Sequence, residues 1–345
     1  MLIARAPLRL SLAGGGTDLE PYYAKYGGAV VSTSIDKYFY VIVSLSDAPH
    51  IQVSSSDYQT FYRQRFEAEP VWEGDLRLPR AIINHFGIET GLSIFLASQV
   101  PPGTGLGSSS TVAVALIKAM AVMCRVDMTP GEIADLACYI EIDRLKTPIG
   151  KQDQYAAAFG GLNYLEFSSN GVTVSPLELS HDLILEMENR LLLFFTGRSR
   201  NSAQILTEQR RSSERNRGTV IQALHALKQE AVDLRTQLMH GNIAALGDSL
   251  HRSWIAKRQL AAGISDPWID QWYETARYAG ATGGKIAGAG GGGFLLLYCE
   301  PQHQRALSDA METLGLSQMD FRFESGGAMV IVNTMHVNAM SKVYA

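Results

Sequence analysis

A decamer rich in glycine and serine constrains this chain more than any other segment. It covers residues 101–110 and reads Pro-Pro-Gly-Thr-Gly-Leu-Gly-Ser-Ser-Ser. Its three glycines have no β-carbon, so a ligand can approach the backbone closely. The apolar segment that begins at Thr111 predicts a helix directly behind this loop. Free N–H groups and the positive end of the dipole at a helix start attract anions, usually phosphate. The simpler alternative is a tight loop whose serines cap the helix.

Composition excludes several classes of protein. The chain has 345 residues, enough for two lobes with a sizeable core, and 46% of them are hydrophobic and 19% charged. A net charge of −4 argues against non-specific binding of nucleic acid. The three cysteines lack the spacing of metal ligands, and we find neither a signal peptide nor an apolar membrane span. We therefore expect a cytoplasmic protein that binds neither nucleic acid nor membrane; a homodimer stays open.

Helix and strand patterns are interspersed along the chain without strict alternation, which favours an α+β fold. Strands are expected over 2–12, 29–35, 38–44, 51–54, 92–99, 191–196, 294–299 and 329–333. Helices are expected over 18–25, 78–85, 202–241 and 266–279, behind the decamer, and after a capping box at Thr129–Glu132. The best boundary between lobes falls near residues 180–189. We therefore predict an N-terminal lobe over 1–185 and a C-terminal lobe over 186–345.

Three common nucleotide-binding patterns do not fit this chain. The Walker A motif is absent, because Gly284-Lys285 is followed by Ile286 rather than by Ser or Thr. Glycines at 288, 290 and 293 have the spacing of a dinucleotide fingerprint, but a strand pattern follows them where that motif needs a helix. The His-Arg-Asp loop of protein kinases is missing as well.

Three separated segments together resemble the three motifs of the GHMP small-molecule kinases, the family of galactokinase and of homoserine, mevalonate and phosphomevalonate kinases. The segments are residues 6–18, the decamer, and residues 283–294, in the order of the family. The resemblance covers residues 4–335. It implies a GHMP kinase fold, with an N-terminal lobe like domain 2 of ribosomal protein S5 and a ferredoxin-like C-terminal lobe. It also implies ATP as phosphoryl donor and Mg²⁺ as cofactor.

The resemblance assigns the nucleotide to the second and third motifs. Their backbone N–H groups would surround the triphosphate, with Mg²⁺ beside it. The implied ATP-binding residues are Pro101, Gly103, Thr104, Gly105, Leu106, Gly107, Ser108, Ser109, Ser110, Gly288, Ala289 and Gly290.

The family's catalytic and metal-binding residues carry over onto matching positions. The segment 150–155 resembles the family's aspartate segment, which makes Asp153 the general base. Arg9 precedes Asp18 by nine residues, as the active-site arginine does in galactokinases, and would keep Asp153 ionised. An ordinary salt-bridged strand residue is the alternative for Arg9.

The implied magnesium ligands are Ser109 and Glu141, which lies twelve residues before Asp153. A solvated helix residue is the alternative for Glu141, and Asp143 would then be the ligand.

The first motif bears on the acceptor. Residues 14–18 read Gly-Gly-Gly-Thr-Asp, where galactokinases have Gly-Glu-His-Thr-Asp. The segment looks like that of the heptose 7-phosphate kinases, and fucokinase domains share a related version. This implies transfer to the anomeric hydroxyl of D-glycero-D-manno-heptose 7-phosphate, on the route to a nucleotide-activated heptose. The implied substrate-binding residues are Gly16, Thr17, Asp18, Tyr22, Arg198 and Arg200, of which the two arginines would hold the distal phosphate.

Two alternatives to this function stay open. The first is a kinase that phosphorylates another sugar at its anomeric carbon. The second is a sugar sensor without catalysis, which should have lost the base or the metal ligands; Asp153, Ser109 and Glu141 are all present and argue against it.

Overall fold

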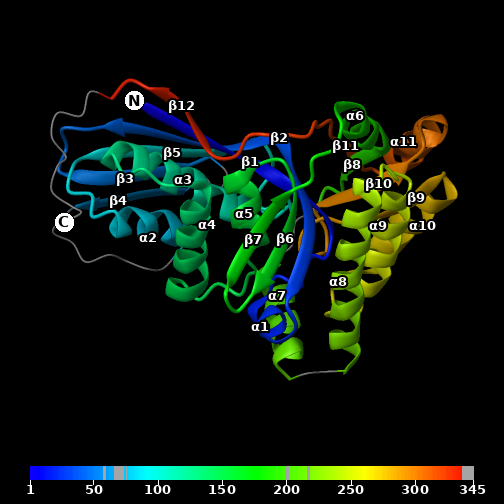
Figure 1. Ribbon diagram of the computed structural model, residues 1–345. Coiled ribbons are helices and arrows are strands. Elements are labelled where there is room, and N and C mark those ends of the chain that lie inside the picture. The colour runs from blue at the N-terminus through cyan, green and yellow to red at the C-terminus, as the bar shows by residue number, and fades with distance from the viewer. Residues whose placement is uncertain (57–59, 66–73, 75, 199–201, 216–217, 336–345) are drawn as a thin grey trace.

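A computed structural model describes residues 1–56, 60–65, 74, 76–198, 202–215 and 218–335. Its strands form two sheets, each with helices packed beside it (Figure 1). The first lobe contains β1 Leu2–Ala13, α1 Glu20–Tyr26, β2 Gly28–Leu45, β3 His50–Ser55, β4 Thr60–Arg65, α2 Arg77–His85, β5 Leu92–Ser98, α3 Ser108–Cys124, α4 Pro130–Cys138, the π-helix η1 Tyr139–Arg144, α5 Gln152–Phe159, β6 Leu162–Ser168, β7 Gly171–Pro176 and β12 Met329–Asn333. The second contains α6 His181–Arg190, β8 Leu191–Phe195, α7 Ser202–Glu214, α8 Gly218–Met239, α9 Ala245–Lys257, α10 Pro267–Tyr278, β9 Ala281–Ile286, β10 Phe294–Cys299, the 3₁₀-helix η2 Pro301–His303, α11 Gln304–Thr313 and β11 Ser317–Gln318.

The first sheet is built on the long strand β2. Its strand order is β12-β1-β2-β5-β3-β4, and β6 and β7 branch from β2. The first part of β2 pairs with β6 and the last part with β5, while β1 runs along both. The two strands predicted at 29–35 and 38–44 are therefore one strand. Asp36 and Lys37 form a bulge opposite the Pro7–Leu8 step, where the register shifts, and do not end the strand.

The even-numbered residues on one face of β1 contribute to two cores, one at each end of the strand. Its first residues place Leu2 and Ala4 in a core that lies within the first lobe. Farther along, Leu10 and Leu12 lie in a second core, which also contains Leu193 and other residues of the second lobe. The two lobes therefore share one apolar core at their junction.

The second sheet has the order β11-β8-β10-β9, with every neighbouring pair antiparallel. In chain order its strands and helices form a β-α-β-β-α-β unit, which is the ferredoxin-like arrangement expected for the C-terminal lobe. The α+β prediction is confirmed. The chain then returns to the first lobe, where β12 pairs with β1. Residues 329–333 thus belong to the first sheet. The helix α6 runs across the lobe boundary predicted at 185/186, and the position of that boundary stays a prediction. None of the described helices is long and apolar enough to cross a membrane.

Candidate active site

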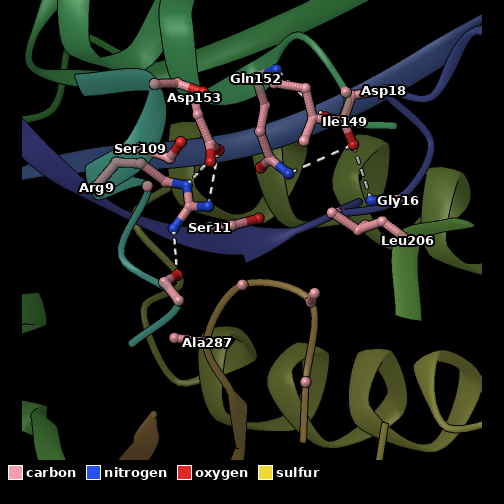
Figure 2. A pocket seen from close by; sticks show the side chains of 18 of the residues that line it. Arg9, Ser11, Gly16, Asp18, Ser109, Ile149, Gln152, Asp153, Leu206 and Ala287 are labelled. Carbon is pink, nitrogen blue, oxygen red and sulfur yellow. Dashed lines mark hydrogen bonds and ion pairs between the residues drawn. The ribbon is translucent and has the colours of Figure 1, made fainter. Parts of the chain in front are cut away.

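A cavity of about 490 Å³ lies where the first and second lobes meet, and all three motifs reach it. Figure 2 shows side chains from β1, the loop after it, α5 and α7 around this space. The cavity is lined by Arg9, Ser11, Gly15, Gly16, Asp18, Leu19, Pro102, Gly103, Gly105, Gly107, Ser108, Ser109, Ser110, Ile149, Gly150, Gln152, Asp153, Leu206, Gln209, Lys257, Ala287, Gly288, Ala289, Gly290 and Gly292.

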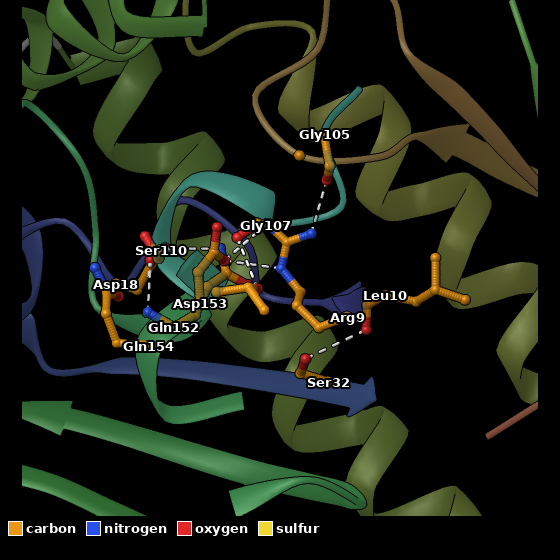
Figure 3. A network of polar contacts seen from close by, with 12 residues as sticks. Arg9, Leu10, Asp18, Ser32, Gly105, Gly107, Ser110, Gln152, Asp153 and Gln154 are labelled. Carbon is orange, nitrogen blue, oxygen red and sulfur yellow. Dashed lines mark hydrogen bonds and ion pairs between the residues drawn. The ribbon is translucent and has the colours of Figure 1, made fainter. Parts of the chain in front are cut away.

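Arg9 and Asp153 form the central ion pair of this cavity (Figures 2 and 3). Arg9 Nη2 lies 2.7 Å from Asp153 Oδ1, and Arg9 Nε donates to the same oxygen at 2.8 Å. Arg9 Nη1 donates to the carbonyl oxygen of Gly105 at 2.7 Å. Arg9 is only 3% exposed, whereas the side chain of Asp153 is 23% exposed toward the cavity. Arg9 thus connects Asp153 to the glycine-rich loop.

The glycines of the second and third motifs pack directly against one another. A β-carbon on Gly105 would lie 2.4 Å from the carbonyl oxygen of Ala287, and one on Gly288 would lie 2.5 Å from Gly105 Cα. Gly107 precedes α3 in the left-handed conformation, with a φ of 81°. A β-carbon there would lie 3.3 Å from the carboxyl of Asp153. Backbone replaces side chains along this wall, as a phosphate-binding loop requires.

Asp18 lies in the opposite part of the cavity wall. Its Oδ1 accepts from Gly16 N at 3.0 Å and from Gln152 Nε2 at 3.4 Å, and its Oδ2 accepts from Gln152 N at 3.3 Å (Figure 2). Burial, followed by the neighbouring charge of Asp153, raises the pKa of Asp18. Buried atoms of two further lining residues, Ser11 Oγ and Gln152 Oε1, have no hydrogen-bond partner among the described residues. Unpaired polar atoms of this kind suit a ligand that carries hydroxyl groups.

Glu141 is buried behind the start of α3 and is not the solvated residue of the alternative interpretation. It is 2% exposed and lies on the π-helix η1. Its two oxygens accept from Ser110 Oγ at 3.1 Å and from Gln154 Nε2 at 2.8 Å (Figure 3 shows the two donors). Burial raises the pKa of Glu141 to about 7. It lines a smaller cavity of about 100 Å³, which Ser109 shares with the larger one.

The oxygen atoms near Ser109 fit a magnesium ion that is bound together with a nucleotide. Among the described residues, no three His, Cys, Asp or Glu side chains gather as a metal cluster. Mg²⁺ is commonly held by one or two carboxylates together with substrate phosphates and water. Glu141 and the Ser109 hydroxyl supply hard oxygen ligands of that kind. Asp143 is exposed and lines neither cavity.

Comparison with known proteins identifies the family. Family models of the GHMP kinases N terminal domain and of the GHMP kinases C terminal match residues 76–161 and 223–315. A D-glycero-alpha-D-manno-heptose 7-phosphate kinase from Campylobacter jejuni is 33% identical over 329 residues, 94% of this chain and 96% of that protein. The chain belongs to the GHMP kinase family. The predictions of this family and of an ATP-dependent phosphotransferase are therefore confirmed.

Solved structures agree with the GHMP kinase fold. A D-glycero-D-manno-heptose 1-phosphate kinase from Bacteroides thetaiotaomicron superposes with a TM-score of 0.81 at 30% identity, over 97% of this chain and all of that one. A putative sugar kinase from Campylobacter jejuni gives a TM-score of 0.77 at 32% identity, over 95% of this chain and 97% of that one. Galactokinase from Lactococcus lactis shares the fold, with a TM-score of 0.74 at 17% identity over 95% and 94% of the two chains.

Some residues predicted for this GHMP kinase site support the cavity from behind. Pro101 is exposed beside it, whereas Thr104 and Leu106 are buried under the loop. Thr17 is fully buried, and its hydroxyl donates to the carbonyl oxygens of Gly14 and Ala29.

Neither Tyr22 nor Arg198 is among the residues that line the cavity. Tyr22 is buried in the core of the second lobe, with its hydroxyl 2.8 Å from His225 Nδ1. Arg198 Nη1 lies 3.4 Å from Asp266 Oδ2, and its guanidinium lies over the rings of Trp268 and Trp272. Arg200 lies outside the described residues.

The structure adds residues to the site that the sequence did not indicate. Besides Ser11 and Gln152, the second lobe contributes Gln209 from α7 and Lys257 from the end of α9. Gln209 Nε2 donates to the carbonyl oxygen of Gly16 at 3.3 Å. Neither Gln209 nor Lys257 belongs to a glycine-rich motif. Only the packing of the second lobe brings them to the first.

Proposed function

We propose that this kinase transfers the γ-phosphoryl group of ATP to the anomeric hydroxyl of a D-glycero-D-manno-heptose 7-phosphate. One observation carries the proposal. The Arg9–Asp153 pair lies between the glycine-rich loop and the polar wall formed by Asp18 and Gln152. A triphosphate on the loop and a sugar on the polar wall can therefore meet at the same carboxylate. The sugar itself is inferred from relatives whose names are those of heptose phosphate kinases.

Each side chain of the pair has a distinct task in this reaction. The Asp153 carboxylate accepts the proton of the acceptor hydroxyl as the sugar oxygen bonds to phosphorus. A hydrogen bond and an ion-pair contact from Arg9 fix that carboxylate in place. The N–H groups at the start of α3 and the positive end of its dipole bind the negative phosphates. Mg²⁺ held by Ser109 and Glu141 would neutralise phosphate charge.

Hydrogen-bonding groups of the polar wall match a sugar ring. Asp18 can accept from hydroxyl groups, and the unpaired oxygens of Ser11 and Gln152 can do the same. A binding site for the distal phosphate of the sugar has less support from the geometry. Arg198 and Arg200 stay the predicted ligands, and Arg198 would have to leave Asp266 and turn toward the cavity.

The relatives' names differ in the phosphate that they specify. The Campylobacter jejuni protein is named for a heptose 7-phosphate, and the Bacteroides thetaiotaomicron protein for a heptose 1-phosphate. Phosphorylation of either compound at the other end gives the same 1,7-bisphosphate. The acceptor must therefore be tested directly, and product mass alone does not decide.

The test is ADP release with ATP, magnesium and each acceptor separately: heptose 7-phosphate, heptose 1-phosphate, unphosphorylated heptose, L-fucose and galactose. We expect the highest kcat/KM with heptose 7-phosphate, and phosphorus NMR should show the new phosphate on the anomeric carbon. Preference for the 1-phosphate or for a free sugar overturns the proposed acceptor. Sugar binding without ADP release would support a sensor.

A further inference from the structure

A buried lysine from the second lobe reaches the cavity beside the catalytic pair. Lys257 is the last residue of α9 and is 7% exposed. Its Nζ donates to the carbonyl oxygen of Gly288 in the third motif. Gly288 in turn packs on Gly105, whose carbonyl oxygen accepts from Arg9. Lys257 is therefore placed at the nucleotide side of the cavity and not at the far end of the acceptor wall.

The ammonium group of Lys257 has more hydrogen-bond donors than acceptors around it among the described residues. It carries three N–H bonds, and among the described residues Gly288 O is the one acceptor that it reaches. A buried ammonium without a carboxylate partner is costly, since burial removes it from water and nearby charge compensates only in part. Such a group is retained where a ligand supplies the missing negative charge. In this cavity, the triphosphate of the proposed reaction would supply that charge.

Charged groups near Lys257 come from β1, from the loop after it, from α5 and from β9. Arg9 on β1 repels its charge, and Asp18 and Asp153 attract it, while burial, followed by the charge of Lys257, lowers the pKa of Lys285 on β9. Burial, followed by Arg9, lowers the pKa of Lys257 to about 8. The group is thus charged at neutral pH and loses its proton under mildly alkaline conditions.

We propose that Lys257 donates to the γ-phosphoryl group of ATP during transfer, from the side of the cavity that the second lobe provides. This inference rests on the proposed kinase function. In the step, the bond between the γ-phosphorus and the β,γ-bridging oxygen breaks, and a bond to the sugar oxygen forms. The proton of the sugar hydroxyl goes to Asp153. Lys257 keeps its own protons and stabilises the charge on the phosphoryl oxygens, opposite Arg9.

Binding of ATP and of ADP to a Lys257→Met variant tests the contact without any acceptor. Met keeps most of the length of the side chain and removes the charge. We expect ATP affinity, measured by calorimetry with magnesium, to fall about 10- to 100-fold, the worth of a hydrogen bond to a charged group, while ADP affinity stays nearly unchanged. An equal loss for ATP and ADP, or no loss, overturns the proposal. Lys257→Arg should retain the preference for ATP over ADP. If Lys257→Arg loses as much ATP affinity as Lys257→Met, the proposal is also overturned.

Lys285→Met is the matched control. Lys285 is equally buried in the same lobe, but its Nζ donates to Leu12 O at 3.3 Å and the residue does not line the cavity. Burial lowers its pKa well below the ordinary value. We expect its ratio of ATP to ADP affinity to match that of the wild type. A ratio as low as that of Lys257→Met would mean that loss of any buried lysine perturbs the loop, and would overturn the assignment.

The pH profile gives a second readout. The kcat/KM of the wild type with respect to ATP should decline above about pH 8, as Lys257 loses its proton in the free enzyme. Lys257→Arg should lack this decline, because a guanidinium does not titrate there. The same alkaline decline in Lys257→Arg overturns the proposal. If the wild type phosphorylates no sugar, the proposed function fails, and the comparison of ATP with ADP still decides the role of Lys257.

Discussion

Arg9 gives the site its geometry at the scale of single residues. Its guanidinium makes two contacts with the carboxylate of Asp153 and donates one hydrogen bond to Gly105 O. Because Arg9 is buried, the side chain has few alternative positions, and a misplaced guanidinium would leave a buried charge without a partner. The pair therefore fixes the position of the Asp153 carboxylate before any ligand binds.

Asp153→Asn keeps the shape of the side chain and removes the charge. Turnover should fall by about 10²- to 10⁴-fold, the usual worth of general-base help. ATP affinity should change little, because backbone N–H groups bind the triphosphate, and the remaining amide oxygen can still accept from Arg9. Turnover, calorimetry with ATP and the thermal midpoint check these expectations. Asp127→Asn, at an exposed loop position of the same lobe, is the control. Near-normal turnover in Asp153→Asn would exclude it as the base.

Asp18 should make stability depend on pH. Its pKa is raised in the folded protein by burial and by Asp153, so the folded state holds this proton more tightly than the unfolded state. The resulting stabilisation is fully present below the ordinary pKa of about 3.9 and is lost as the pH rises through the folded pKa. Asp18→Asn does not titrate. Its free energy of unfolding relative to the wild type should therefore increase from about pH 4 to pH 7, measured in urea. A constant or decreasing difference would contradict the raised pKa.

At the scale of elements, the contact between the second and third motifs joins the two lobes beside the cavity. Gly105 and Gly263 both have a positive φ, of 86° and 79°. A β-carbon would have nothing within 4 Å at Gly263, but would meet Ala287 O at Gly105. Both alanine variants bear a conformational cost of about 1–2 kcal/mol. Gly105→Ala should in addition push the second and third motifs apart. This should lower the thermal midpoint further and weaken the binding of ATP. Equal midpoints and equal ATP affinities in the two variants would show that the close contact is not needed.

Local sequence signals predicted the elements that depend on local chemistry. The capping box at Thr129 starts α4 as expected, with both of its hydrogen bonds present. The decamer leads into α3, and the strand pattern over 294–299 is β10. The branching of the first sheet could not be predicted, because pairing of β2 with β6 and β5 depends on contacts between distant segments. Gln209 and Lys257 were missed for the same reason.

The family motifs predicted the residues around the Arg9–Asp153 pair better than the arginines that would hold a distal phosphate. Asp153, Arg9 and Asp18 lie in glycine-flanked segments with a fixed spacing, and the structure brings them to one cavity. The arginines that follow the strand over 191–196 belong to no motif with a fixed spacing. Arg198 is paired with Asp266, a residue 68 positions away that no local pattern connects with it.

At the scale of the whole molecule, the shared core couples the stability of the lobes. Leu10 of β1 and Val31 of β2 pack in one cluster with Leu234 of α8 and Leu296 of β10. Lobes joined only by a polar interface can unfold separately, and large proteins often do so. Exposing half of a continuous apolar core would cost the remaining lobe much of its burial free energy. We therefore expect the two lobes to unfold together.

Ile94→Ala tests this coupling from the far side of the first lobe. Ile94 is fully buried on β5, in the core that lies within that lobe, and loss of its side chain should cost about 2–5 kcal/mol. Trp254, Trp268 and Trp272 lie in the second lobe, so tryptophan fluorescence reports that lobe once Trp72, outside the described residues, is replaced by Phe. Circular dichroism reports both lobes.

If the lobes unfold together, Ile94→Ala shifts the urea midpoint of fluorescence as far as that of circular dichroism. A fluorescence midpoint that stays at its original value while circular dichroism splits into two transitions would show independent lobes. The reciprocal variant, Leu297→Ala in the buried strand β10, should shift both signals as well. A cooperative result has a consequence for catalysis. Arg9 and Lys257 come from different lobes, so their separation across the cavity is held by the same core that sets global stability.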